Sequence, residues 1–368
     1  MHECVFLCSF TYYIEMITIE SVLQALGHVE EPDLKKDLVT LNMIRNVVVQ
    51  PDKISFDVVL TTPACPLKGH IEHACRNAIA LFVDKTIKVD INMTSEVKAP
   101  ERNQLASIKN IILVASGKGG VGKSTVAANL ALALSATGAK TGLLDADIYG
   151  PSLPMMFGLE GARPLTEQQP DGKTKMLPIE KYGLKLLSIG FFTDPNQPIP
   201  WRGPMVSTAV KQLFNDCEWG ALDYLVVDLP PGTGDVHITI SQGFPIAGAV
   251  IVTTPQQVAL ADAVKGIGMF LMESINIPLI GVVENMAYFT PAELPDAKYY
   301  LFGKDGGKRL AEQFNTPLLG EIPIVKSISD AGDNGFPIAL DEQDPTAQAF
   351  AIIAGKVAQQ LSILHARK

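Results

Sequence analysis

The stretch that decides the fold is Gly117-Lys118-Gly119-Gly120-Val121-Gly122-Lys123-Ser124. It matches the phosphate-binding pattern G-x-x-x-x-G-K-[ST], in which glycines let the backbone wrap around phosphate groups. An apolar run at residues 111–115 enters the loop, and a helical pattern leaves it from Thr125 onward. A chance glycine-rich turn, the alternative, would lack this order of strand, loop and helix. The stretch therefore predicts a site where the N–H groups at a helix N-terminus bind the phosphates of a nucleotide.

The loop contains two side chains with predicted roles, and a third, Lys118, that has more than one interpretation. Lys123 should reach the β- and γ-phosphates, and the Ser124 hydroxyl should ligate Mg²⁺. Lys118 directly follows the first glycine and makes the loop the variant K-G-G-x-G-K-[ST]. From the residues alone, a solvated surface charge is the alternative for Lys118.

Two acidic segments downstream of the loop complete the predicted site. Asp145 and Asp147 follow the apolar run 141–144, and Asp228 ends the run 224–227. Carboxylates at strand ends can face the phosphates and support the Mg²⁺ shell. The continuation of Asp228, Leu229-Pro230-Pro231-Gly232-Thr233-Gly234-Asp235, is typical of a switch segment that senses the γ-phosphate. A helix cap or a turn is the alternative for each aspartate taken singly.

Short apolar runs alternate with helical patterns through the rest of this region. Such runs, buried on both faces and separated by helices, favour a parallel sheet wrapped by helices. We interpret residues 161–178 and 193–200, rich in proline, glycine and polar side chains, as loops. The further runs are at residues 249–253 and 279–283, and the helical stretches are at 125–135, 259–272 and after Pro345.

The N-terminal part of the chain has a different rhythm and predicts a separate small α/β domain at residues 17–97. Its expected order is a helix, two strands joined by a short turn, a second helix and a third strand, at 17–27, 44–49, 54–60, up to 82, and 86–93. Residues 98–108 read as a linker and 109–368 as the phosphate-loop domain. Residues 1–16 are expected to be a tail or an over-called start.

Composition limits the function classes. The 368 residues are 47% hydrophobic with a formal charge of −9, which argues against global disorder and against nucleic acid binding by bulk positive charge. Apolar runs such as residues 244–252 are far shorter than the roughly 20 residues of a membrane-spanning helix. Five scattered cysteines favour a reducing compartment, which we interpret as the cytoplasm. We expect a soluble protein with neither nucleic acid nor a membrane as partner.

Taken together, these segments resemble the Mrp/ApbC-type iron–sulfur cluster carrier ATPases, a branch of the deviant P-loop NTPases that also includes the Min and Par ATPases and nitrogenase iron protein. Residues 17–97 resemble the metal–sulfur cluster assembly domain often fused ahead of them, with Thr62-Pro63-Ala64-Cys65-Pro66 as its signature. The other matching motifs are the phosphate loop, Asp145-Ala146-Asp147-Ile148-Tyr149-Gly150-Pro151-Ser152, Trp201-Arg202-Gly203-Pro204-Met205, the segment 219–235, Thr254-Pro255-Gln256, Glu284-Asn285-Met286 and Phe302-Gly303-Lys304-Asp305-Gly306-Gly307.

The resemblance implies a homodimer that binds ATP at its interface. It implies slow, Mg²⁺-dependent hydrolysis by attack of water on the γ-phosphate, and delivery of iron–sulfur clusters to recipient apoproteins with the help of assembly proteins. Lys118 would reach the partner's nucleotide, Asp147 would orient the attacking water, and Asn285 would bind the adenine. The implied catalytic residues are Lys118, Lys123, Asp147 and Asp228; the nucleotide-binding residues are Gly117, Lys118, Gly119, Gly120, Val121, Gly122, Lys123, Ser124, Thr125 and Asn285; the Mg²⁺ residues are Ser124, Asp145 and Asp228.

One departure from the family concerns the cluster ligands. Typical members carry a C-x-x-C pair before the Phe-Gly-x-x-Gly-Gly element, but residues 288–300 here contain no cysteine. Cys65, between two prolines, is the remaining candidate for an iron–sulfur ligand or exchange thiol. Nearby, His70 and His73 with Cys75 could add metal ligands, although we favour a core Cys75 and solvated histidines.

Two other functions remain open from the sequence. A Min- or Par-like switch ATPase would carry no cluster, but residues 347–368 have few of the cations that membrane-binding helices carry. A non-catalytic adaptor is disfavoured because Lys123, Ser124, Asp147 and Asp228 are all present.

Overall fold

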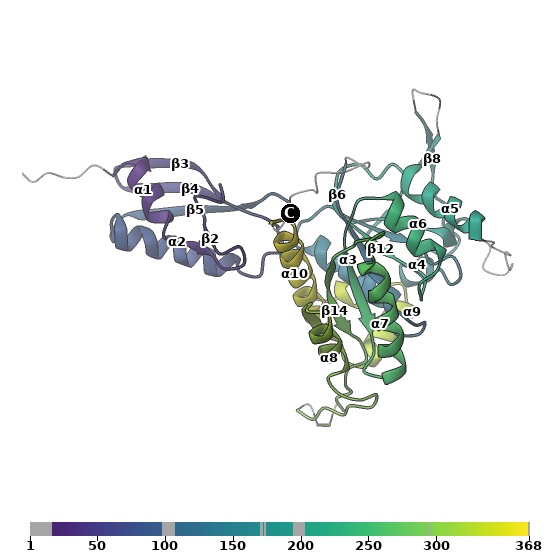
Figure 1. Ribbon diagram of the computed structural model, residues 1–368. Coiled ribbons are helices and arrows are strands. Elements are labelled where there is room, and N and C mark those ends of the chain that lie inside the picture. The colour runs from purple at the N-terminus through teal and green to yellow at the C-terminus, as the bar shows by residue number, and fades with distance from the viewer. Residues whose placement is uncertain are drawn as a thin grey trace, which may run out of the picture. The chain divides into compact units, whose positions relative to one another are not determined.

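The computed structural model describes residues 17–97, 107–169, 172, 174–193, 203–291, 293–294 and 296–366. The predicted tail, most of the predicted linker (98–106) and residues 194–202 lie outside the described residues. By its contacts the chain divides into two compact units (Figure 1). The first runs to Leu60 and resumes at Leu67–Ser95, and the second consists of Thr61–Pro66 and Glu96–Lys368. This division differs from the sequence-based boundaries mainly in the short segment Thr61–Pro66.

The small unit has a three-stranded sheet with β4 at its centre. β3 pairs with β4 antiparallel, and β5 pairs with β4 parallel. Alternate residues of β4, including Ile54, Phe56 and Val58, are buried, as the period-2 pattern of a half-buried strand requires. The order agrees with the prediction, apart from a short β1–β2 hairpin that the sequence did not reveal. The elements are α1 (Ile19–Leu26), β1 (Glu30–Glu31), β2 (Lys36–Asp37), β3 (Ile44–Gln50), β4 (Lys53–Leu60), α2 (Lys68–Phe82) and β5 (Lys88–Ser95).

The large unit is built on an eight-stranded sheet with the order β10-β11-β7-β12-β6-β13-β14-β15. All neighbouring strands are parallel except β10 and β11. This confirms the predicted parallel sheet, because near-continuous apolar strands buried on both faces are typical of one. The strands are β6 (Ile108–Ala115), β7 (Thr141–Asp145), β10 (Ile179–Lys181), β11 (Leu184–Ser188), β12 (Leu222–Asp228), β13 (Ile246–Thr253), β14 (Leu279–Glu284) and β15 (Leu318–Glu321).

Helices cover both faces of this sheet and enclose two hydrophobic cores. α3 and α10 pack on one face, and α5, α6 and α7 on the other (Figure 1). β8 and β9 form a short hairpin inside residues 161–178, so the prediction of a loop there was wrong, since strands of three residues leave little periodic signal. The remaining elements are α3 (Lys123–Ala136), α4 (Leu153–Met156), β8 (Thr166–Gln168), β9 (Thr174–Met176), α5 (Gly203–Asn215), α6 (Asp235–Gly243), α7 (Gln257–Leu271), α8 (Gly306–Gln313), α9 (Lys326–Asp333) and α10 (Pro345–Ala366), with 3₁₀ turns at Ile189–Phe191 and Ile338–Leu340.

The C-terminal helix α10 is, among the described helices, the one long and apolar enough to cross a membrane by length and composition. Several of its apolar residues pack within the protein, however, although Ile352 is exposed. Phe350, Ile353 and Val357 are each at most 1% exposed and belong to the core that α3 shares with the sheet. In this structure α10 is therefore a core helix of the large unit.

The strand order brings the predicted acidic residues to one edge of the sheet. β12 lies between β7 and β6, and Asp228 is paired in register with Asp145 on one side and Val114 on the other. Because the carboxyl ends of parallel strands meet at the same edge, the loop that follows Ala115 and the two aspartates converge there.

Candidate nucleotide site

The loop between β6 and α3 depends on glycine at two positions. Gly122 is the N-cap of α3 and has φ +79°, a left-handed conformation that L side chains rarely adopt. A Cβ on Gly122 would collide with the side-chain amide of Asn285, and a Cβ on Gly117 would collide with the backbone of Asp262 in α7. The loop can thus lie this close to its neighbours only with glycine at these positions.

Lys123 is the first residue of α3 and its side chain is 6% exposed. Its Nζ lies 2.5 Å from Oδ1 of Asp228 and 3.6 Å from Oδ2 of Asp147, and it donates to Oγ of Ser124 at 3.3 Å. A buried ammonium needs counter-charges, and here two carboxylates of the same site provide them. The structure therefore brings together four residues that the sequence analysis placed in one site.

Asp145 is fully buried and points to other partners. It accepts hydrogen bonds from the backbone N–H of Asp147 at 3.0 Å, from Oγ of Ser188 at 2.9 Å and from the N–H of Leu153 at 3.3 Å. Burial, and secondly the charge of Asp228, raises the pKa of Asp145 to about 7, against the effect of these bonds. Two of these bonds hold the backbone of Asp147 and Leu153 against Asp145.

Ser188 is a residue of the site that was not expected from the sequence. Ser188 ends β11 and pairs in register with Asp145 of β7. The available signal was a polar residue at the end of the apolar run 184–187, but nothing in the sequence indicates that this run pairs with β7.

Two carboxylate oxygens of the site are candidates for binding a cation. Oδ2 of Asp228 and Oδ1 of Asp147 are buried, and neither has a hydrogen-bond partner among the described residues. Burial raises the pKa of Asp228, opposed by the Lys123 ammonium. In the described part of the chain, no group of three or more His, Cys, Asp or Glu side chains is placed to hold a metal. The residues fit Mg²⁺, which proteins commonly bind through one or two carboxylates together with substrate phosphates.

Asn285 and Lys118 differ in how they relate to the loop. Asn285 follows β14, is 7% exposed, and donates from Nδ2 to the carbonyl of Val121 at 2.9 Å. Lys118 is exposed, and its ammonium makes no ion pair with any residue that the structure describes. Asn285 is thus part of the loop's packing, whereas Lys118 points its charge to solvent. Their implied contacts with adenine and with a partner's nucleotide stay predictions.

The segment after Asp228 is tied to β6 and to the loop that follows it by backbone hydrogen bonds. The N–H of Leu229 donates to the carbonyl of Val114 at 3.1 Å, and that of Gly232 donates to Ser116 at 2.9 Å. The segment leads into α6, where His237 is completely buried. Burial, with a smaller contribution from the charge of Lys123, lowers the pKa of His237 to about 4. His237 is a second residue that sequence reasoning missed.

The cysteines divide into two kinds. Cys75 in α2 and Cys217 are buried, and burial raises the pKa of each thiol to about 12, which makes both poor nucleophiles. Cys65 is half-buried. His70 and His73 are exposed, which confirms that Cys75 belongs to a core and the histidines are solvated. Cys4 and Cys8 lie outside the described residues.

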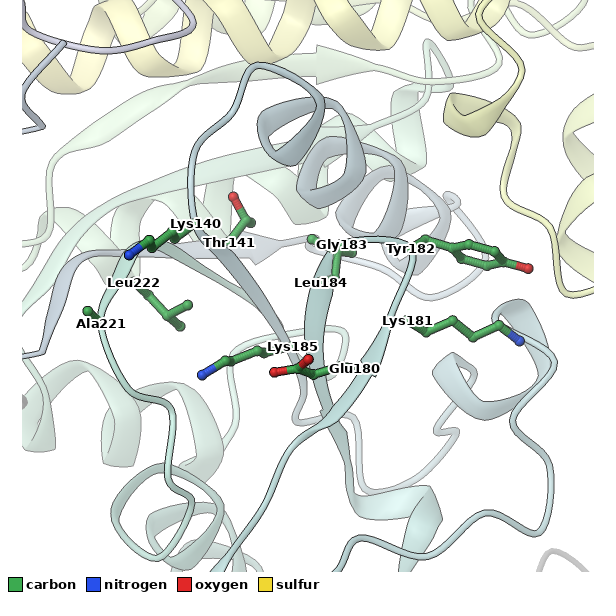
Figure 2. Close-up of a pocket in the computed structure, with 10 residues that line it drawn as sticks. All are labelled: Lys140, Thr141, Glu180, Lys181, Tyr182, Gly183, Leu184, Lys185, Ala221 and Leu222. Atoms are coloured by element: carbon green, nitrogen blue, oxygen red, sulfur yellow. The ribbon is translucent and has the colours of Figure 1, made fainter. Parts of the chain in front are cut away.

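A pocket of about 500 Å³ lies at the opposite end of the sheet, where β7, β11 and β12 begin (Figure 2). It contains three lysines, but Lys181 points away from Lys140 and Lys185 in Figure 2 and donates to the carbonyls of Phe157 and Gly158. Lys185 donates to the carbonyl of Trp219 at 2.9 Å. Two of the three ammonium groups at this pocket are thus already hydrogen-bonded to backbone carbonyls.

Comparisons with known proteins agree with this geometry. The family model described as NUBPL iron-transfer P-loop NTPase matches residues 107–358, and that of an iron–sulfur cluster assembly protein matches residues 19–91. An iron-sulfur cluster carrier protein of Synechocystis is 47% identical over 95% of this chain and 99% of its own length, and one of Deinococcus radiodurans is 45% identical over 94% and 96%. A solved nucleotide-binding protein from Archaeoglobus fulgidus, in complex with ADP, is 37% identical over 66% of this chain and 92% of its own, with a TM-score of 0.56.

The geometry at Gly122 predicts the effect of adding one methyl group. We expect Gly122→Ala to weaken ATP binding at least about tenfold, or about 1.4 kcal/mol, because the new Cβ displaces Asn285 and distorts the loop. Gly138→Ala is the matched control, since Gly138 also has a positive φ, +93°, but nothing within 4 Å of its Cβ position. Calorimetric titration with a non-hydrolysable ATP analogue measures both. Equal affinities in the two variants would contradict the expectation.

The buried imidazole of His237 predicts a pH dependence of stability. Its folded pKa of about 4 is below the ordinary 6.5, so the folded protein binds fewer protons than the unfolded chain between these values. Above pH 6.5 the free energy of unfolding therefore carries no penalty from His237. As the pH falls toward 4, it decreases by roughly 3 kcal/mol, because the unfolded chain takes up a proton that the buried imidazole does not. Chemical denaturation of wild type and His237→Leu from pH 7.5 to 4 should show the gap between their unfolding free energies shifting by that amount in favour of the variant. Parallel curves would refute the assignment.

Proposed function

The chain belongs to the NUBPL iron-transfer P-loop NTPase family, and on that premise we propose that it binds and hydrolyses ATP to assist the assembly or transfer of iron–sulfur clusters to apoproteins. The observation that carries the proposal is the buried cluster of Lys123, Asp147 and Asp228 beside an intact phosphate loop. We further propose that the protein acts as a homodimer in the cytoplasm, with assembly proteins and recipient apoproteins as partners.

ATP binding exchanges the partners of Lys123. The β- and γ-phosphates take over from the carboxylates as counter-charges of the ammonium, while the N–H groups at the start of α3 bind the phosphate oxygens. Ser124 and Asp228 would hold Mg²⁺, with Asp145 acting on its outer shell. The bound ion supplies charge neutralisation at the phosphates. Lys118, exposed on the loop, would contribute its charge to the nucleotide of the second subunit.

Hydrolysis needs a positioned water and a stabilised leaving group. In the proposed reaction Asp147 orients a water whose oxygen bonds to the γ-phosphorus as the bond to the β,γ-bridging oxygen breaks, which leaves ADP and inorganic phosphate. Oδ1 of Asp147 is buried and has no partner among the described residues, so it is available for such a hydrogen bond. Positioning of the water and neutralisation of the charge on the transferred phosphoryl group together supply the catalysis.

The cargo site is proposed at Cys65. Thiolates are the ligands that iron–sulfur clusters use, and Cys65 is the half-buried cysteine of the described part of the chain. A cluster held there would take its other ligands from outside the described part of one chain, and we propose a second copy as their source. The absence of cysteine from residues 288–300 favours this location over the one typical of the family.

Lys118→Ala tests the dimeric arrangement of the ATP site. We expect ATP turnover to fall at least about tenfold while the affinity for nucleotide changes little, because the charge acts on the partner's phosphates as the γ-phosphate leaves. Phosphate release and calorimetric titration measure the two quantities. Lys140→Ala, which removes an exposed lysine at the other end of the sheet, is the control. Unchanged turnover in Lys118→Ala would rule out this role.

Cys65→Ala tests the cargo site. After anaerobic reconstitution with ferrous iron and sulfide, we expect wild type to hold iron and acid-labile sulfide in stoichiometric amounts per dimer and Cys65→Ala to lose them. Cys217→Ala, which removes a buried thiol, should retain the cluster. A wild-type protein that binds no cluster would favour a switch ATPase or adaptor that carries none itself.

A further inference from the structure

The short segment that carries Cys65 belongs to the large unit. Thr61–Pro66 lies between β4 and α2 of the small unit in the sequence, yet its contacts group it with the residues from Glu96 onward. Thr62 is 1% exposed, and Ala64, 8% exposed, is part of the core formed by α3, α10 and the sheet. The residues on both sides of Pro63 are therefore packed into the large unit.

A buried hydrogen bond fixes this segment. Oγ1 of Thr62 lies 2.9 Å from the hydroxyl oxygen of Tyr224 in β12, and it also accepts the N–H of Ala64 at 3.1 Å. Tyr224 is 1% exposed. Neither hydroxyl can exchange its partner for water at such burial, so losing one partner leaves the other unsatisfied. The same Oγ1 thus joins the Tyr224 side chain to the backbone next to Cys65.

Helix α10 holds the segment from a second direction. A Cβ placed on Gly355 would be 3.4 Å from the carbonyl oxygen of Ala64 and 3.9 Å from the side chain of Pro66. The helix backbone therefore approaches the segment closely on the side where Gly355 has no side chain. The two prolines that flank Ala64 and Cys65 restrict the backbone further.

Strand β12 connects Tyr224, the partner of Thr62, to the nucleotide site. Tyr224 and Asp228 are four residues apart on one strand, so their side chains lie on the same face, about 13 Å apart along the strand. Asp228 is the carboxylate that pairs with Lys123. One rigid strand at the centre of the sheet therefore carries both the partner of the Cys65 segment and the partner of the phosphate-binding lysine.

We propose that Thr62 and Tyr224 are positioning residues that clamp the Cys65 segment to β12, so that Cys65 keeps a fixed place relative to the nucleotide site. This proposal rests on the proposed function of Cys65 as a cluster ligand. The clamp holds Cys65 to the large unit, although Cys65 lies within the residues that match the cluster assembly family.

The test is the accessibility of Cys65 in the full chain, measured as its rate of alkylation by iodoacetamide with peptide-resolved mass spectrometry. Tyr224→Phe and Thr62→Val each remove one hydroxyl from the clamp and keep most of the side-chain volume. We expect Tyr224→Phe to raise the rate at Cys65 about fivefold, the shift in a local opening equilibrium that one lost buried hydrogen bond produces. Thr62→Val should raise it at least as much, because it also removes the acceptor of the Ala64 N–H. The double variant should show no increase beyond that of Thr62→Val, because Tyr224→Phe breaks only the bond that Thr62→Val already removes.

Two controls separate clamping from general stability. Thr141→Val removes a buried hydroxyl from β7, directly beside Tyr224, without touching the segment. It should leave the rate at Cys65 unchanged. The ratio of labelling at Cys65 to that at the buried Cys217 should rise only in the clamp variants, since global destabilisation would raise both. Equal ratios in wild type and both single variants, or additive effects in the double variant, would overturn the proposal.

A second measurement separates failure of the clamp from failure of Cys65 as the cluster ligand. The rate at which a reconstituted cluster is lost to a ferrous chelator should rise in Tyr224→Phe and not in Thr141→Val. If Cys65→Ala keeps its cluster, the carrier role of Cys65 fails, while the alkylation ratios still decide the clamp.

Discussion

The ion pair between Lys123 and Asp228 is the interaction around which the large unit is organised. A buried ammonium is tolerated only with counter-charges in place, and Lys123 finds them at the ends of two different segments. Those segments meet because β12 pairs with β7 and β6 in a register that aligns Asp228 with Asp145 and Val114. Whether the Lys123 ammonium finds its counter-charges thus depends on the order of three central strands. In the proposed function, ATP replaces these carboxylates with its phosphates as the counter-charges of Lys123.

Most of this site could be predicted from the sequence because it is written in local patterns. The glycine loop, the lysine and serine that follow it, and aspartates at the ends of apolar runs each have a spacing set by strand, loop and helix geometry. The register of the parallel strands then brings these residues together at one edge of the sheet. Ser188 and His237 could not be predicted, since their roles depend on which strands become neighbours and on burial by elements distant in sequence. The short strands β8, β9 and β10 were missed because three residues carry no clear period.

Domain boundaries were the other limit of sequence reasoning. The motif at Thr62–Pro66 reads as part of the small domain because it lies between two of that domain's elements. Its contacts, however, are with Tyr224 and Gly355, residues more than 160 positions away. Such long-range packing leaves no local trace. It changes the functional interpretation, because the candidate cargo thiol lies in the large unit and not in the domain whose signature it bears.

The proposed function couples ATP hydrolysis to the transfer of iron–sulfur clusters. The most direct measurement is the rate of cluster transfer from the reconstituted full-length protein to an apo-ferredoxin, with and without Mg²⁺ and ATP, in wild type and in Asp147→Asn. The account predicts that ATP changes the wild-type transfer rate several-fold and that Asp147→Asn, which should bind ATP without hydrolysing it, loses that change. Equal transfer rates under all four conditions would contradict it and would separate the ATPase from any role in carrying clusters.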